Sequence, residues 1–482
     1  MTPKPPPVAM DEVQGIILRG YGLLTSAHFV LLAIDDPVQA RTWLKSLELT
    51  SAKSKPTERA VNVAFTHAGL QRLGLPDACL DGFSREFQEG MDTDHRHRVL
   101  GDTHQHAPSN WQWGTCKDSD SIHVLLMLYG KGWYELTALI AEEKAKYRAA
   151  GLVEYRTFDP VHLEGRKEHF GFRDGIAQPF VEGAAKEAPT TVREKDQYGN
   201  SVPAGEILLG YPNAYGTLPP SPTHGPFDFG AQGSYLVVRQ LSQDVGAFWK
   251  FLVQKAGPPG PNQPADRAAV ELASKMVGRW PSGAPLAVSP TTDNALYMDE
   301  DEYAYRKDPL GLTTPIGSHT RRSNPRDSLE PGPGGEERLT AAESLEVTKL
   351  HRIIRRGRPY GRPVADSMKP ADILRALDSD NYPIEDRGLL FLGFNANIAR
   401  QFEFIQQTWI NNPKFGGLYE DTDPLMGHRW PTEMARPADA FTQQAEPVRR
   451  RITGLPDFVK VLGGGYFFMP GLRAVAELAE LT

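Results

Sequence analysis

Residues 171–175 (Gly-Phe-Arg-Asp-Gly) hold Asp174 in a glycine-rich stretch, and a carboxylate fixed in this way can move a proton. Glycine tolerates the backbone conformations of tight turns, and it lets the main chain approach a flat ligand without an intervening side chain. Gly175 is therefore a candidate for contact with such a ligand. The same residue types also build ordinary turns, so the segment alone is consistent with either a turn residue or an acid positioned for catalysis.

The second half of the chain contains a possible metal ligand and a possible fixed cation. His319 opens the segment 319–327, and Arg355 lies in an arginine-rich segment that begins at His351. Imidazole is a common metal ligand, and arginine keeps its positive charge at any physiological pH. The chain has thirteen histidines, so residue type alone does not choose between His319, His351 and the others.

In this order, the aspartate, histidine and arginine segments resemble the marker of the dye-decolorizing (DyP-type) haem peroxidases. That marker is Gly-x-x-Asp-Gly, followed by a proximal histidine and then by a distal arginine. Thr320 is a departure, because the family commonly carries an aliphatic residue after the proximal histidine. Further short family-like stretches are distributed along nearly the whole chain, at 62–67, 87–91, 100–102, 388–391, 400–404, 409–413 and 464–468.

The resemblance implies a peroxidase that uses hydrogen peroxide to oxidise organic reductants such as dyes and phenolics. His319 would be the axial ligand of the haem iron. On the other side of the haem, Asp174 would move a proton between the peroxide oxygens, first as base and then as acid. Arg355 would stabilise the charge that develops as the O–O bond breaks. An oxoferryl intermediate would return to rest by two one-electron reductions.

The implied cofactor is haem b, bound without a covalent link. By the same resemblance Arg326 would pair with a haem propionate through its two-pronged guanidinium, and Leu389 and Phe391 would wall the distal pocket. The only cysteines, Cys79 and Cys116, form no Cys-x-x-Cys motif of the kind that attaches haem or holds zinc.

Three other functions are compatible with parts of this pattern. A haem carrier or iron-releasing protein would need His319 but not the pairing of Asp174 with Arg355. A chlorite-dismutating enzyme would use a proximal histidine and a distal arginine without the 171–175 segment. A non-haem metal protein could use the histidines between 95 and 106, although the acidic residues among them favour a solvated loop.

Length and charge restrict the remaining possibilities. The chain has 482 residues, and single cores stop growing at about 250 to 300 residues, so two domains are expected. The net charge of −7 indicates no basic surface for nucleic acid or an anionic membrane. The N-terminus shows no apolar or twin-arginine leader, and no run of about 18 apolar residues occurs, so we expect a cytoplasmic protein.

Apolar periodicity predicts a repeated order of strands and helices. In the first half, strands are expected at 29–34, 61–65, 122–129 and 153–158, and helices at 36–49 and 133–149. In the second half, strands are expected at 235–239, 389–394 and 465–468, and helices at 245–254 and 398–409. Paired strand–helix–strand units build an antiparallel sheet with helices on one face, so the fold class is α+β with duplicated ferredoxin-like domains.

The resemblance implies the same fold, of the dimeric α+β barrel superfamily type. An N-terminal ferredoxin-like domain is expected at 1–160, and a C-terminal haem-binding domain with long Pro/Gly-rich insertions at 161–482. If Arg355 lies on a strand, its neighbour Arg356 points to the opposite face, so only one of them can face the haem. The sequence does not identify the group that orients the His319 ring.

Long Pro/Gly-rich stretches interrupt the second half at 211–230, 256–264 and 330–335. Loops of this length are uncommon in compact domains, and these either shape the access to the haem or cover the surface. The acidic run 299–302 could attract a divalent cation, but four neighbouring acids are usually a solvated turn.

Overall fold

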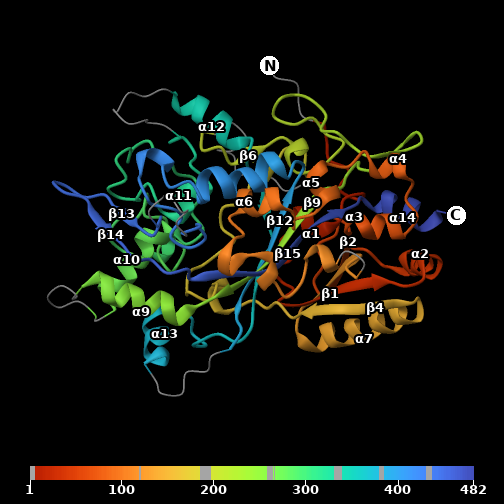
Figure 1. Ribbon diagram of the computed structural model, residues 1–482, viewed down its shortest axis with the longest axis horizontal. Helices are drawn as coiled ribbons and strands as arrows, with labels where there is room; N and C mark the ends of the chain where they lie inside the picture. Colours follow the sequence, from red (N-terminus) through yellow and green to blue (C-terminus); the bar gives the residue numbers. More distant parts are fainter. Residues whose placement is uncertain are drawn as a thin grey trace.

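The longest strands pair in one antiparallel sheet that runs through the middle of the molecule (Figure 1). The computed structural model describes residues 6–118, 121–184, 197–257, 264, 266–329, 339–378, 385–429 and 437–481. The sheet strands are β1 (Ser26–Ile34), β2 (Arg59–Phe65), β3 (Val124–Gly130), β4 (Leu152–Phe158), β9 (Ser234–Gln243), β10 (Ile354–Arg355), β11 (Arg358–Tyr360), β12 (Gly388–Asn395) and β15 (Val459–Met469). Their order is β10-β12-β9-β15-β2-β3-β1-β4, with β11 also paired to β12.

Each half of the sheet has the strand order of a ferredoxin-like unit. In the first half the order is β4-β1-β3-β2, with α2 (Pro37–Ser46) after β1 and α7 (Trp133–Ala149) after β3. In the second half, β15-β9-β12-β10 repeats that order, with α9 (Val245–Ala256) after β9 and the π-helical segments η7 (Ala399–Glu403) and η8 (Ile405–Ile410) after β12. The predicted duplicated ferredoxin-like fold is confirmed. Only three strands were predicted for the second repeat, and the short strands β10 and β11 take the place of the missing fourth.

Shorter elements surround the sheet, and their ends follow local capping rules. Asp36 begins α2, because its side chain accepts hydrogen bonds from the main-chain N–H groups of Val38 and Gln39. No helix in the described part of the chain has the length and apolar character needed to cross a membrane. The other α-helices are α1 (Gly15–Leu18), α3 (His67–Arg72), α4 (Asp77–Leu80), α5 (Arg85–Glu89), α6 (Asp94–Leu100), α10 (Arg267–Val277), α11 (His319–Ser323), α12 (Ala341–Lys349), α13 (Pro370–Leu377) and α14 (Leu472–Glu480). Small strand pairs are β5 (Phe180–Val181) with β6 (Ser201–Val202), β7 (Thr223–His224) with β8 (Phe227–Asp228), and β13 (Phe441–Gln443) with β14 (Arg450–Ile452).

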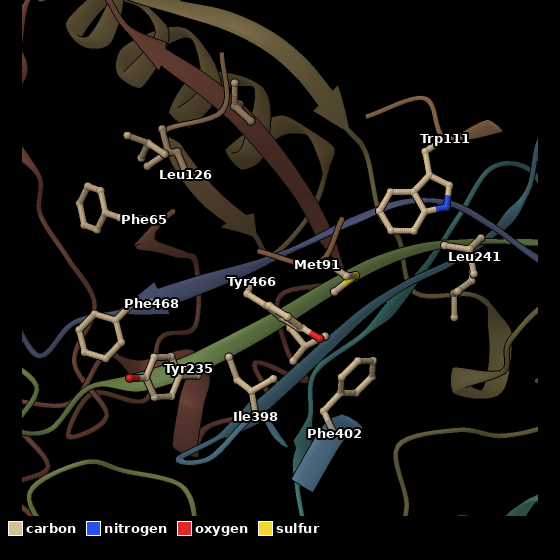
Figure 2. Close-up of a cluster of buried hydrophobic side chains, with 14 of the residues drawn as sticks. Phe65, Met91, Trp111, Leu126, Tyr235, Leu241, Ile398, Phe402, Tyr466 and Phe468 are labelled. Carbon is tan, nitrogen blue, oxygen red and sulfur yellow. The ribbon is translucent and has the colours of Figure 1, made fainter. Parts of the chain in front are cut away.

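The sheet separates two apolar layers. Every residue of β3 is buried, and its side chains alternate between the layers, with Leu126 in one and Met127 in the other. The buried apolar side chains of α2, α7 and α9 belong to the layer of Leu126, so these helices cover one face as predicted. Figure 2 shows that side chains from both halves meet in this layer: Phe65, Leu126, Tyr235, Ile398, Phe402 and Phe468.

The histidine-rich stretch is not the solvated loop that the sequence predicted. Residues 94–100 form α6, which the Thr93 side chain caps at its start and which ends at Gly101 in a left-handed conformation. Val99 and Arg96 are buried, so this short helix has an inner face that its polar composition obscures. Among the described residues, no group of histidine, cysteine and acidic side chains is arranged to hold a metal ion.

The long stretch at 211–230 is a surface excursion that carries β7 and β8 and contacts α4. None of its residues lines the cavity described below. Most of the stretch at 256–264, and all of 330–335, lie outside the described residues.

Candidate active site

A cavity lies against the helix-covered face of the C-terminal half of the sheet. Alternate residues of β9 (Arg239, Leu241 and Gln243) and of β12 (Leu389 and Phe391) line it. The register places Leu389 opposite Leu241 and Phe391 opposite Arg239, so these side chains share one face. The cavity has a volume of about 270 Å³. This is about twenty times the space that one water molecule requires, so the cavity has room for a ligand of many atoms.

His319 lines this cavity as the first residue of α11. Its ring Nδ1 donates to Oδ2 of Asp423, at 2.9 Å, and the other carboxylate oxygen accepts from the main-chain N–H groups of Leu425 and Met426. Burial lowers the pKa of His319, but the Asp423 carboxylate outweighs it, and the pKa is raised overall. Since Nδ1 is occupied, Nε2 is the ring atom available to a metal ion.

Asp174 and Arg355 meet in the same cavity. Arg355 Nη1 lies 3.4 Å from Asp174 Oδ1, which also accepts the main-chain N–H of Gly175 at 2.6 Å. Arg355 is held by β10, which pairs with Gly393 of β12, and by its main-chain N–H, which donates to Gln178 Oε1 at 2.9 Å. The two side chains are 40% and 32% exposed, so both can reach a small molecule that enters the cavity.

Arg356 points away from the cavity, as the alternation of a strand predicts. Its Nε donates to the main-chain oxygen of Ile16 at 3.0 Å, and its Nη2 donates to that of Ile17 at 3.2 Å. Arg356 does not line the cavity, whereas Arg355 does. Of this pair, only Arg355 thus faces the cavity, as expected for neighbouring residues on a strand.

Arg326 also lines the cavity, but protein groups already hold its guanidinium. It pairs with the Asp301 carboxylate, and its Nη1 donates to the main-chain oxygens of Asp301 and Tyr303, at 3.0 and 3.2 Å. Asp301 pairs with Arg279 as well, at 3.2 Å. The acidic run 299–302 is therefore not simply a solvated turn, because Asp301 faces two arginines.

The lining fits a haem group. His319 supplies the nitrogen ligand that iron prefers, and the walls are mostly apolar. Gly175 has φ +78°, and a Cβ at this position would meet no atom within 4 Å, so its main chain presents an open surface to the cavity. Neither cysteine lines the cavity. The apolar lining residues are Phe170, Phe172, Ile176, Ala177, Leu241, Val277, Ile353, Leu389, Phe391, Phe402, Ile405, Ile410, Leu425, Met426 and Val459.

The structure brings together every residue that the sequence singled out for the site. Asp174, Gly175, His319 and Arg355 line the cavity, together with the three residues expected at the haem edge and walls. Asp423 was missed. It lies 104 residues beyond His319, and no spacing rule connects a ring nitrogen to a carboxylate so far along the chain.

Comparisons with known proteins identify the family of the whole chain. The model of the DyP dimeric alpha+beta barrel domain matches residues 12–155. The chain is 35% identical to the multifunctional dye peroxidase DyP2 of an Amycolatopsis species, over 97% of this chain and 96% of the relative. It is 30% identical to the dye-decolorizing peroxidase msp1 of Mycetinis scorodonius, over 98% of this chain and 88% of the relative.

Solved structures extend the likeness to the whole fold. A decolorizing peroxidase from Auricularia auricula-judae has a TM-score of 0.76 at 26% identity, with 98% of this chain and 100% of that chain covered. A dye-decolorizing peroxidase in complex with 2,6-dimethoxyphenol has a TM-score of 0.74 at 26% identity, with the same coverage. The present chain therefore belongs to the dye-decolorizing peroxidase family, and it is a DyP-type peroxidase.

Proposed function

We propose that this enzyme activates hydrogen peroxide at a non-covalently bound haem b and oxidises organic reductants such as dyes and phenolics. The observation that carries the proposal is the pairing of Asp174 with Arg355 in the cavity that His319 also lines. The bound haem would supply the iron at which the peroxide O–O bond is cleaved and to which the reductant returns electrons. The relative in complex with 2,6-dimethoxyphenol supports a phenolic as one class of reductant.

His319 would hold the haem iron through Nε2. Asp423 keeps the proton of the ring on Nδ1, because an ionised carboxylate can only accept a hydrogen bond. Burial raises the pKa of Asp423, but His319 and the Met426 N–H outweigh it, and the pKa is lowered overall. An anionic partner of this kind fixes the ring and makes Nε2 a stronger donor to a metal.

Asp174 would carry the proton that must pass from one peroxide oxygen to the other. Both hydrogen bonds that the described residues make to its carboxylate involve Oδ1, so Oδ2 is the atom available to take and return a proton. Arg355 would stabilise the negative charge on the departing oxygen. A single well-placed donor contributes about 3 to 4 kcal/mol to such a step in other enzymes.

Stability does not explain why Asp174 and Arg355 are paired. An ion pair as exposed as this one contributes at most about 1 kcal/mol to folding. A haem carrier would have no use for an acid and a cation at this place. The pair is therefore better explained by chemistry on a small molecule in the cavity.

The remaining candidates would contact the cofactor. Leu389 and Phe391 would wall the pocket from β12, and the main chain at Gly175 would approach the flat face or edge of the haem. Arg326 would pair with a propionate, in which case Asp301 would have to share the guanidinium.

Four variants test the proposal: Asp174→Asn, Arg355→Leu, His319→Ala and, as a control, Asp159→Asn at a surface acid that is 55% exposed. Haem content and turnover with peroxide and 2,6-dimethoxyphenol are measured for each. We expect Asp174→Asn to keep its haem and to lose about 10²- to 10⁴-fold in rate. His319→Ala should lose or loosen the haem, and the control should match the wild type. Full turnover of Asp174→Asn would move the proton transfer to another group, and a wild type that binds haem without turnover would favour a carrier.

A further inference from the structure

Residues 166–174 form a tight hairpin that carries Asp174 at its end. Two main-chain hydrogen bonds join its arms, from Asp174 N to Arg166 O at 3.1 Å and from Glu168 N to Phe172 O at 2.9 Å. The position of Asp174 therefore depends on how firmly the loop between the arms is closed.

The Glu168 side chain fills the inside of that loop. Its Oε2 accepts the main-chain N–H of Phe170 and its Oε1 accepts that of Phe172, both at 2.9 Å. Gln243 donates to Oε2 from β9 at 2.6 Å, which ties the hairpin to the central sheet. The carboxylate is thus held by two donors of its own loop and one of the sheet, and it lies in the wall of the cavity.

We propose that Glu168 is a positioning residue for peroxide activation, which holds the hairpin so that the Asp174 carboxylate stays beside Arg355. This inference rests on the proposed role of Asp174. Two inward-facing N–H groups need two acceptors, and a carboxylate supplies both, whereas a glutamine supplies one and an alanine none.

The test uses haem-loaded enzyme with Glu168→Ala, Glu168→Gln, Asp174→Asn and the double variant Glu168→Ala/Asp174→Asn. Glu164→Gln is the control, because this acid is exposed and belongs to the same stretch of chain. Three quantities are measured: haem content, the rate of reaction with hydrogen peroxide, and hydrogen exchange of the Phe170 and Phe172 amides.

In Glu168→Ala we expect exchange of the two amides to rise and the peroxide rate to fall, each by about tenfold or more, with haem content unchanged. Glu168→Gln should lie between this variant and the wild type, and Glu164→Gln should match the wild type. The double variant should be no slower than Asp174→Asn alone, since a positioning residue acts through the group that it positions.

The inference is overturned if Glu168→Ala reacts with peroxide at the wild-type rate, or if the double variant loses the full product of the two single effects. Should Glu168→Ala fail to bind haem, Glu168→Gln decides the question, and a wild-type rate in that variant overturns the inference. If Asp174→Asn itself reacts normally, the proposed function fails. A slow Asp174→Asn beside an unaffected Glu168→Ala overturns only the role of Glu168.

Discussion

Two carboxylates support the proposed peroxide cleavage, although neither of them transfers the proton between the peroxide oxygens. Asp423 accepts the Nδ1 proton of His319, and Glu168 closes the loop that leads to Asp174. Asp423 does not line the cavity, and Glu168 is proposed only to hold Asp174 in place, so the effects of both should be indirect. The two differ in charge state, since the pKa of Asp423 is lowered and burial raises the pKa of Glu168 to about 7.

Replacing Asp423 by asparagine should weaken haem binding and raise the midpoint potential of the bound iron. The neutral side chain no longer makes the His319 ring electron-rich, and the loss of such a partner typically costs about 10- to 100-fold in metal affinity. Haem titration and a spectroelectrochemical potential measure the two effects. Glu420→Gln, at a surface acid paired with Arg451, is the control. An unchanged potential in Asp423→Asn would show that the hydrogen bond does not tune the iron.

Glu168 should make stability depend on pH between about 4.5 and 7. Burial is the main cause of its raised pKa, and the negative charge of Asp174 adds to it. The folded protein binds this proton more tightly than the unfolded chain, so the stabilisation is complete at low pH and is lost as pH rises through about 7. The loss is on the order of 3 kcal/mol.

Urea unfolding of wild type and Glu168→Gln at pH 5 and pH 7.5 measures this difference. Asp174, whose negative charge adds to the raised pKa of Glu168, is unchanged in both proteins. The wild type should lose more stability than the variant over this interval. Equal losses would mean that Glu168 titrates at its ordinary pKa.

At the scale of elements, a short strand and a hairpin position the two groups that we propose to act on peroxide. β10 is only two residues long, yet its pairing with β12 is enough to send Arg355 into the cavity and Arg356 to the far side of the sheet. The hairpin 166–174 contributes Asp174 from a different part of the chain. Gly171 allows the hairpin to turn, with φ +95°.

Gly171→Ala should disturb the hairpin more than an ordinary replacement of glycine. A Cβ at this position would come within 2.9 Å of Ile373 Cδ1 and 3.2 Å of Met368 O, in addition to the strain of a positive φ. Gly216→Ala is the matched control, because Gly216 also has a positive φ, +73°, and its Cβ would meet no atom within 4 Å. We expect Gly171→Ala to lose about 1 to 3 kcal/mol more stability than the control, together with part of its peroxide rate. Equal losses in the two variants would argue that crowding at the hairpin is absent.

Long apolar elements were predictable from the sequence, and short or polar ones were not. The helix expected at 133–149 is α7, with the same bounds, and the strand expected at 153–158 is β4 with one residue more. The periodicity at 398–409 indicates a helix but cannot show that its hydrogen bonds are π-helical. β10 and β11 are too short for any periodicity to be seen, and α6 has a mostly polar sequence.

The residues of the site also include some that could be predicted from the sequence and some that could not. Asp174, His319 and Arg355 could be predicted because a family pattern names them, and each lines the cavity. Asp423 and Glu168 could not, because their partners are set by tertiary packing. Glu168 stands three residues before the 171–175 segment, yet nothing in the sequence shows that its carboxylate turns back into the loop.

At the scale of the whole molecule, the two ferredoxin-like units share one sheet. Strand β15 pairs with β9 along most of its length and with β2 at Phe468 and Phe65. The C-terminal helix α14 packs against α2 of the N-terminal half, where Lys45 and Glu480 form an ion pair at 2.9 Å (Figure 1). The boundary that the sequence predicts at residue 160 therefore separates two halves of one sheet that share a core. We propose that it is a boundary between structural repeats.

The shared sheet predicts that both halves unfold together. Calorimetry of the haem-free protein should show one transition, with equal calorimetric and van't Hoff enthalpies. Two separated transitions would show instead that the halves on either side of residue 160 are independent folding units.

The central claim is that Asp174 transfers the proton during peroxide cleavage, and stopped-flow absorption tests it most directly. Haem-loaded wild type and Asp174→Asn are each mixed with one equivalent of hydrogen peroxide. The Soret band of the wild type should shift within milliseconds and return when a phenol is added, while the variant, with equal haem, should shift at least about 100-fold more slowly. Equal rates in the two proteins would contradict the account.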